Sequence, residues 1–218
     1  MNPVPAQPDD TPGDGASRAP SGLPRSATDE QLLLAHRTGD PDAIGELVHR
    51  YERELFHFLV RFIGDRAAAE DIFQEAFLQV HQSAHQFDTS RRFKPWLFTI
   101  AANKARDYLR SAGRRSAAPL QAGMGGEGTG EYIDLLESPI DLPGQQLSDA
   151  ETRERVRKVV MSLPDHLREI LLLSYFQQFP YKQISEMLDI PLGTVKSRLH
   201  AAVAQFAERW KSLNRDAG

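Results

Sequence analysis

The 218-residue sequence contains no cysteine. This absence excludes disulfides, thiolate metal sites and cysteine nucleophiles, and it is typical of proteins in a reducing compartment. Long hydrophobic runs are also lacking, because the most apolar stretch, residues 170–173, is far shorter than the ~20 residues of a membrane span. The N-terminus has no basic start followed by an apolar core, the pattern of a secretory signal. We therefore expect a cytoplasmic protein without membrane insertion.

The alternation of apolar and polar residues that is typical of strands is absent as well. Apolar residues recur at helical spacing instead, and glycines and prolines separate the periodic segments. In the first half of the chain, helices are predicted over about 28–38, 40–63, 66–84 and 95–113. In the second half they are predicted over about 148–163, 165–178, 180–188 and 194–210. The predicted fold class is all-α, and the last two helices with their tight turn have the layout of a helix-turn-helix.

Proline and glycine are concentrated in two segments. Residues 1–27 hold six prolines and three glycines, with too few aliphatic side chains for a core, so we expect a disordered extension. Residues 116–150 hold a glycine cluster and six acids but no Lys or Arg, which is typical of a flexible linker. Four parts are therefore predicted: the extension 1–27, a helical domain 28–115, a flexible acidic linker 116–147 and a helix-turn-helix domain 148–213. Capping boxes that start at Thr28 and Ser148 mark the first residues of the two domains.

Cations dominate residues 91–115, where eight basic residues accompany one acid and give a net charge of +7. Aromatic residues are interleaved with these cations. Such a segment favours nucleic-acid binding, with cations on phosphates and aromatic faces stacked on unpaired bases. The alternative is a solvated helix whose aromatics fill the core. We favour phosphate contact for the arginines and a core position for Trp96, Leu97 and Ile100.

The last predicted helix combines an inward apolar stripe with a polar face near its start. The stripe consists of Val195, Leu199, Ala202, Val203 and Phe206. The outward residues are Thr194, Lys196, Ser197, Arg198 and His200. A recognition helix presents such residues to the major groove, where they reach base edges and phosphates. An unrelated helical hairpin would give the same pattern, so both interpretations stay open at this point.

A polar face of a different kind is predicted on the helix over 66–84. It consists of Glu70, Asp71, Gln74 and Glu75. These residues extend beyond the first turn, so the helix dipole does not explain them as it explains Asp65, and we interpret the face as a protein-docking surface. Two other patterns carry no function. The glycines over 123–128 match a dinucleotide motif but follow no strand, and His81 with His85 lacks a third metal ligand.

Three stretches of the sequence carry a family resemblance when they are taken together. They are AAEDIFQEAFL at 68–78, FKPWLFTIAANKARDYLR at 93–110, and the segments Leu163-Pro164, Arg168-Glu169-Ile170 and Tyr181 through GTVKSRL. In this order they resemble region 2.2, regions 2.3 and 2.4, and region 4 of extracytoplasmic-function sigma factors, which are specificity subunits of bacterial RNA polymerase. The resemblance covers both predicted helical domains.

The resemblance implies a role for each candidate residue. Binding to core RNA polymerase is implied for Glu70, Asp71, Gln74 and Glu75. Melting and holding the −10 element is implied for Phe87, Arg91, Arg92, Trp96, Asn103, Lys104, Arg106 and Arg110. Reading the −35 element is implied for Thr194, Lys196, Ser197, Arg198 and His200. The implied partners are core polymerase, promoter DNA and an anti-sigma factor, and no cofactor, metal or catalytic residue is implied.

Two other functions were weighed against a sigma factor. A helix-turn-helix regulator would bind operator DNA independently of polymerase, but the polar face followed by the aromatic and basic segment favours the sigma factor. A helical enzyme acting on nucleic acid would need clustered carboxylates or metal ligands, which the sequence lacks. One departure from the family concerns residues 201–203, which read Ala-Ala-Val where family members often have arginines.

Overall fold

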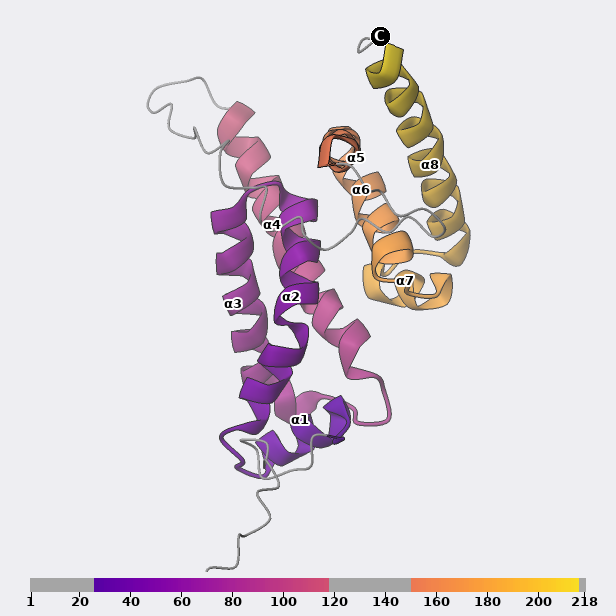
Figure 1. Cartoon of the computed structure of the whole chain (residues 1–218). Helices are drawn as coiled ribbons and strands as arrows, with labels where there is room; N and C mark the ends of the chain where they lie inside the picture. Colours follow the sequence, from indigo (N-terminus) through magenta and orange to yellow (C-terminus); the bar gives the residue numbers. More distant parts are fainter. Residues whose placement is uncertain (1–25, 118–149, 216–218) are drawn as a thin grey trace, which may run out of the picture.

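The computed structural model describes residues 26–117 and 150–215 (Figure 1). Within these two ranges every regular element is a helix and no strand occurs, so the predicted all-α class is confirmed. The predicted disordered extension lies outside the described residues except for its last two positions. The predicted acidic linker, apart from residues 116 and 117, and the cap at Ser148 also lie outside them.

The first helix, α1 (Asp29–Arg37), begins at the predicted capping box. The hydroxyl of Thr28 accepts a hydrogen bond from the backbone N–H of Gln31 at 3.2 Å. The side-chain oxygen of Gln31 in turn accepts from the backbone N–H of Thr28 at 2.8 Å. These two bonds satisfy donors that a helix start otherwise leaves unpaired, which explains why the helix begins here.

Three longer helices complete the N-terminal half: α2 (Ala43–Ile63), α3 (Arg66–Ser83) and α4 (Phe93–Ala117), with a 3₁₀ turn, η1 (Ala84–Gln86), after α3. The helix α2 begins later than the predicted residue 40, because the Asp40 carboxylate accepts from the Asp42 N–H at 3.0 Å and holds a turn there. It is capped by Gly64, whose φ of 81° glycine adopts without strain. At its other end, α4 continues past the predicted stop near Gly113 to Ala117.

The C-terminal half consists of α5 (Ala150–Ser162), α6 (Asp165–Leu171), a π-helical turn η3 (Leu172–Phe176), α7 (Tyr181–Leu188) and α8 (Leu192–Arg215). Pro164 and Pro180 stand immediately before α6 and α7, as their fixed φ favours. Asp189 ends α7 in the left-handed conformation, with a φ of 51°. The helix-turn-helix is therefore confirmed, although α8 begins two residues before the predicted start. The π-helical turn had no signal in the sequence.

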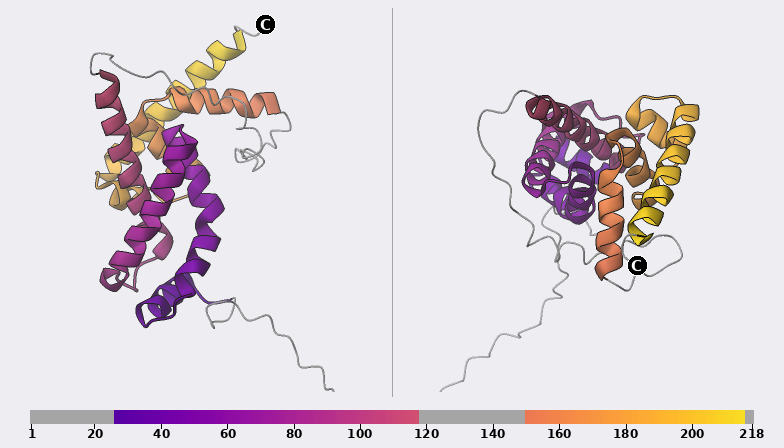
Figure 2. Two further views of the ribbon diagram at one scale, coloured as in Figure 1. Left: turned by 90° about the vertical axis from the view of Figure 1, so that its left-hand side faces the viewer. Right: turned by 90° about the horizontal axis from the view of Figure 1, so that it is seen from above.

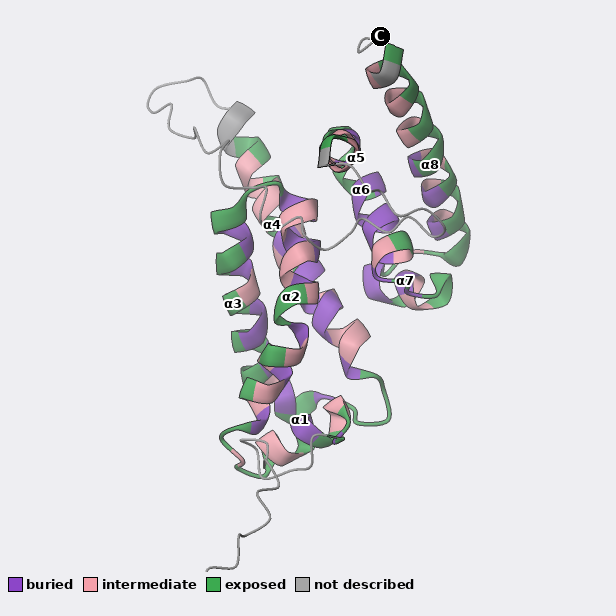
Figure 3. Cartoon of the chain, viewed as in Figure 1, coloured by how far each residue is buried: buried purple, intermediate pink, exposed green. Residues whose placement is uncertain are grey.

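The two halves lie side by side and share one core (Figures 1 and 2). In the N-terminal half α2, α3 and α4 run alongside one another, and α1 lies at one end of them. The C-terminal half contacts α2 through α5, α6 and η3, and it contacts α4 through α7. Buried residues line the facing sides of both halves (Figure 3). The predicted inward stripe of α8 needs one correction: Val203 is 41% exposed, because it lines an open groove between α5, η3 and α8 and is not part of the core.

Candidate nucleic-acid and polymerase interface

The predicted docking face lies along the solvent side of α3. All four of its residues, Glu70, Asp71, Gln74 and Glu75, are exposed, while Ile72 and Ala76 between them are buried. Glu70 pairs with Arg66 on the same helix at 3.0 Å. Leu78 extends this face with an apolar side chain that is 55% exposed. Sequence reasoning missed Leu78, although a leucine one turn after Gln74 was a signal that could have indicated it.

The aromatic and aliphatic side chains of the basic segment lie partly in the core and partly at the surface. Phe93, Leu97 and Phe98 are fully buried, and Ile100 is also buried. Trp96 is half-buried and its ring lies 4.6 Å from that of Phe87. The structure therefore agrees with the core position expected for Leu97 and Ile100, and only in part with that of Trp96. Phe87, a predicted −10 residue, is itself buried at 6% exposure, so its ring supports Trp96 rather than facing solvent.

The polar residues predicted to hold the −10 element lie on α4 and on the loop before it. Arg91, Arg92, Asn103 and Arg110 are exposed, whereas Lys104 and Arg106 are half-buried. Several of these cations already have partners inside the protein. Lys104 pairs with Glu75 of the docking face at 3.2 Å, and Arg110 pairs with Asp107 at 3.2 Å. The Arg106 guanidinium donates to the side-chain oxygen of Asn103.

The predicted −35 residues lie in the first turns of α8. Lys196, Ser197 and His200 are exposed, and Thr194 and Arg198 are half-buried. The preceding turn is held by the Ser185 hydroxyl, which donates to the carbonyl of Ile190 at 2.6 Å. Because this turn fixes α8 against α7, the start of α8 is presented as a rigid, solvent-facing edge, which is the geometry that a recognition helix requires.

Two consecutive charged residues on α6, Arg168 and Glu169, are buried between the halves. The sequence did not predict that they would be buried or which groups they would contact. Arg168 donates to the Phe62 carbonyl at the end of α2 at 2.6 Å, and it also bonds within its own half. The Glu169 carboxylate lies 3.6 Å from the Nε of Arg106 on α4. Burial raises the pKa of Glu169 to about 7, although Arg106 and Arg198 oppose this rise. A charged Arg-Glu pair between the apolar residues Leu167 and Ile170 was the available signal.

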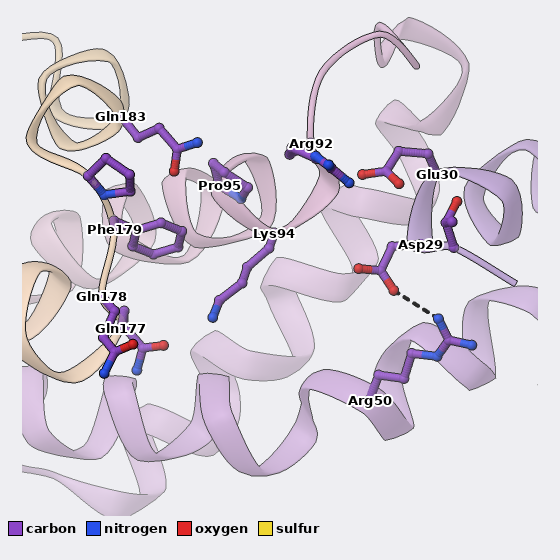
Figure 4. A pocket seen from close by; sticks show the side chains of 12 residues that line it. Asp29, Glu30, Arg50, Arg92, Lys94, Pro95, Gln177, Gln178, Phe179 and Gln183 are labelled. Atoms are coloured by element: carbon purple, nitrogen blue, oxygen red, sulfur yellow. Dashed lines mark hydrogen bonds and ion pairs between the residues drawn. The ribbon is translucent and has the colours of Figure 1, made fainter. Parts of the chain in front are cut away.

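Aromatic contacts also join the halves at the α6–α7 turn. The Phe179 ring lies 5.3 Å from Phe98 of α4, and the Lys94 ammonium lies 5.4 Å from the Phe179 ring centroid. Lys94 is further held by Glu54 at 2.6 Å. Next to these contacts is a cleft of about 420 Å³ between the halves (Figure 4). Its polar wall is formed in part by Asp29, which pairs with Arg50 at 3.0 Å.

Neither a metal site nor a membrane span is found in the described ranges. No group of three or more His, Asp or Glu side chains comes together there in a way that could hold a metal ion. His81 lies against His36, with ring centroids 4.9 Å apart, rather than forming a site with His85. None of the described helices is both long enough and apolar enough to cross a bilayer.

The fold defined by these elements is an all-helical protein whose C-terminal half is a helix-turn-helix. Comparisons with known proteins show which family of helical proteins this chain is similar to. The model of Sigma-70 region 2 matches residues 47–115, and the model of Sigma-70, region 4 matches residues 153–206. The ECF RNA polymerase sigma factor SigW of Bacillus subtilis is 32% identical over 178 residues, which cover 81% of this chain and 94% of the relative. The sigma-E factor of Escherichia coli K12 is 31% identical, with coverage of 80% and 90%.

Solved structures show the same fold at lower sequence identity. CnrH in complex with the cytosolic domain of CnrY matches with a TM-score of 0.60 and 21% identity, covering 84% of this chain and 97% of that one. The sigma factor RpoE in complex with the anti-sigma factor NepR from Bartonella quintana matches with a TM-score of 0.59 and 20% identity, covering 78% and 98%. The chain belongs to the sigma-70 family and is an RNA polymerase sigma factor of the extracytoplasmic-function group, which confirms the family predicted from the sequence.

Proposed function

We propose that this sigma factor directs core RNA polymerase to promoters in two steps that use its two halves. The C-terminal half, through α8, positions the complex on the duplex −35 element. The N-terminal half binds core polymerase through α3 and captures the melted −10 strand through α4. In this proposal the chain supplies recognition and has no catalytic activity of its own. The residues 28–115 and 148–213 would form the two functional domains, joined by the acidic linker.

The observation that carries the proposal is the adjacency of two unlike surfaces on α3 and α4. The acidic docking face and the cations of α4 are linked directly by the ion pair between Glu75 and Lys104. A polymerase surface bound to α3 would therefore hold the melted strand next to α4, where cations on phosphates and Trp96 beside an unpaired base would stabilise it. An isolated duplex-binding regulator has no need for this pairing.

The exposed residues at the start of α8 support duplex recognition. Lys196 and Ser197 can reach phosphates and base edges in the major groove, and His200 extends this edge by one turn. The alanines at 201 and 202, where related proteins often have arginines, leave fewer cations for backbone contact. We infer that −35 binding by this chain depends strongly on Lys196.

An anti-sigma factor is the further partner that we propose. Two of the structural neighbours were solved in complexes, CnrH with CnrY and RpoE with the anti-sigma factor NepR. In this chain, an apolar groove of about 210 Å³ runs between α5, η3 and α8. Its wall includes Phe176, Val203 and Phe206. Exposed apolar surface of this kind suits an amphipathic helix of a regulatory protein.

The experiment that tests the proposal is transcription from a promoter library by core RNA polymerase, with and without the purified chain. Initiation at a discrete set of promoters is expected only when the chain is present. The substitutions Asp71→Ala and Gln74→Ala together should abolish it by removing core binding. Lys196→Ala with Ser197→Ala should reduce it at promoters that depend on the −35 element. As a control, Gln79→Ala with Gln82→Ala changes two exposed residues one to two turns further along α3, beyond the four residues of the docking face, and should leave initiation intact.

Absence of initiation and of core binding, combined with tight binding to duplex DNA alone, would contradict the proposal. That result would favour the operator-binding regulator. Equal loss of initiation in the docking pair and in its α3 control would also contradict the assigned face, because it would mean that α3 tolerates no surface change.

A further inference from the structure

We propose that Arg168 and Glu169 form a clasp that closes the two halves on each other and withholds Arg106 from DNA. The inference rests on the proposed role of Arg106 in holding the −10 strand and concerns how that role is regulated. In the closed arrangement, the Glu169 carboxylate occupies the position beside Arg106 that a DNA phosphate would take. Opening of the clasp would release Arg106, and single-stranded DNA would compete with Glu169 for it.

Geometry places the clasp between the two DNA-binding surfaces. Arg106 lies on α4 and retains 27% side-chain exposure, whereas Glu169 on α6 retains 5%. The 3.6 Å separation of Arg106 Nε and the nearer Glu169 oxygen makes an ion pair but is too long for a hydrogen bond. Both atoms are buried without a hydrogen-bond partner in this arrangement. The contact therefore neutralises charge without fully satisfying either group.

This incomplete satisfaction makes Glu169 a replaceable partner. A buried ion pair gains little net free energy when desolvation is not balanced by good hydrogen bonds. A phosphate can instead accept two parallel hydrogen bonds from one guanidinium, which is a stronger and more directional contact. A phosphate of the melted strand would therefore displace Glu169 from Arg106, whereas a weakly binding solute would not.

Arg168 supplies the second half of the clasp. Its Nη1 donates to the Phe62 carbonyl, which lies in the last turn of α2, where helix carbonyls lack intrahelical partners. Its other bonds, to the Leu163 carbonyl and the Asp165 carboxylate, remain within the C-terminal half. Only the bond to Phe62 is lost when the halves separate. Arg168 thus ties the halves together without being needed by α2 for its own fold.

An apolar contact completes the closed state. Phe179 packs against Phe98 across the interface, and both side chains are buried. Separation of the halves would expose both rings, a cost that favours closure until another partner offsets it. The closed state is therefore the resting arrangement, and it requires both the ionic and the aromatic contacts.

The absence of cysteine makes the test direct, because two introduced cysteines can be labelled selectively. Gln82→Cys on α3 and Ala204→Cys on α8 place spin labels on exposed positions of the two halves, outside the candidate sites. Pulsed electron-spin distance measurements on the full chain should give one narrow distribution for the closed state. Addition of a pool of random single-stranded 12-mers to the otherwise unsubstituted chain should shift it towards longer distances, and this arm requires no change to the clasp.

Substitutions then separate the clasp from ordinary folding. Arg168→Gln removes the hydrogen bond to the Phe62 carbonyl across the two halves, and Phe179→Ala removes the aromatic contact from another position. Both should lengthen and broaden the distance distribution. Glu154→Gln is the control. Within the described residues Glu154 makes one ion pair, with Arg157 of its own helix at 2.6 Å. The substitution should therefore leave the distance distribution unchanged. If opening raises the competent fraction from about 10% to about 50%, binding of the 12-mer pool tightens about fivefold.

Unchanged distances in both Arg168→Gln and Phe179→Ala would overturn the proposal. Longer distances without tighter binding of the 12-mer pool would overturn the part that concerns Arg106. These readouts use no polymerase, so they are distinct from a failure of the proposed function. That failure would be seen as absence of chain-dependent initiation by the unsubstituted protein, whatever its distance distribution.

Discussion

The two candidate DNA-binding surfaces differ in how their cations are held. On α4, Lys104, Arg106 and Arg110 each face a carboxylate of the protein itself. At the start of α8, Lys196 and His200 are exposed, and within the described residues neither takes part in an ion pair with a carboxylate. With the proposed roles, the α8 surface would be ready to bind DNA in the free chain, whereas these three α4 cations would first exchange protein partners for DNA.

This difference follows from the neighbours of each helix. The helix α4 packs between acidic α3 and the C-terminal half, so its cations meet Glu75 on one side and Glu169 on the other. The helix α8 packs on α5, α6 and α7, and Lys196, Ser197 and His200 near its start meet solvent. A surface with internal partners binds DNA only by displacing those partners, which suits a step that occurs after polymerase has been recruited. A preformed surface suits the first contact with duplex DNA.

The largest expected effect tests whether α4 is held by both halves. Phe98 on α4 is fully buried and contacts Phe58 of its own half at 5.4 Å and Phe179 of the other half at 5.3 Å. Phe98→Ala should lower the free energy of unfolding by about 3–5 kcal/mol, because it leaves a cavity that both halves line. Urea unfolding followed by helical circular dichroism measures this loss. Leu78→Ala, at an exposed position, serves as the control, and a loss below about 1 kcal/mol for Phe98→Ala would contradict a shared core.

The second prediction uses the buried carboxylate between the surfaces. The pKa of Glu169 in the folded chain is about 7 against an ordinary value of 4.5, so the folded state binds this proton more tightly than the unfolded state does. Its contribution to stability is therefore present below the ordinary pKa and is lost as the pH rises through about 7. Arg106 and Arg198 limit the rise, and Asp165 adds to it. The contribution is at most about 3 kcal/mol.

Unfolding of the unsubstituted chain and of Glu169→Gln at about pH 5 and about pH 8 measures this effect. The unsubstituted chain should lose more stability over that window than the variant, because glutamine does not titrate. The difference between the two curves cancels the titration of every other group. Parallel curves for the two proteins would contradict the raised pKa of Glu169. Its carboxylate would then no longer distinguish the α4 surface from the α8 surface.

Local features of this fold were predictable from the sequence because they depend on residues close in the chain. Short sequence patterns predicted four of these features: the capping box at Thr28, the end of α2 before Gly64, the proline before α7 and the helix-turn-helix. The exposure of Asp71, Gln74 and Glu75 was predictable for the same reason, since helical periodicity alone decides which face is apolar. The roles of these residues remain proposals.

Features that depend on the packing of the two halves were not predictable. Arg168 and Glu169 carry no periodic signal that says which distant group they meet, and their partners, Phe62 and Arg106, lie in the other half of the chain. The resemblance implied a −10 role for Phe87, and its burial beside Trp96 was not predictable because it depends on how the loop before α4 folds. Val203 was predicted inward because periodicity does not tell how closely α5 and η3 pack against α8.

The third prediction compares the surfaces directly. Lys196→Ala should weaken binding to random-sequence duplex DNA by about 1–2 kcal/mol and lower the slope of log affinity against log salt by about 0.9, because one phosphate contact is lost without any internal rearrangement. Fluorescence anisotropy over a salt series measures both quantities. Lys211→Ala, at an exposed position far along α8, is the control and should leave the slope unchanged. An equal loss of slope in the two variants would argue that α8 binds DNA through its general charge.

The prediction with the smallest expected effect removes the internal partner of one α4 cation, so that this cation is held as those at the start of α8 are. Asp107 and Arg110 are 72% and 67% exposed and pair at 3.2 Å, so their interaction is screened and weak. Asp107→Asn frees Arg110 and removes a negative charge beside the strand, and it should tighten binding of single-stranded 12-mers by about twofold, equivalent to about 0.4 kcal/mol. Glu208→Gln on α8 is the control, because it makes the same change of net charge at an exposed position away from α4. If both variants tighten binding equally, net charge accounts for the gain, and the internal pairing of α4 cations does not limit its contact with DNA.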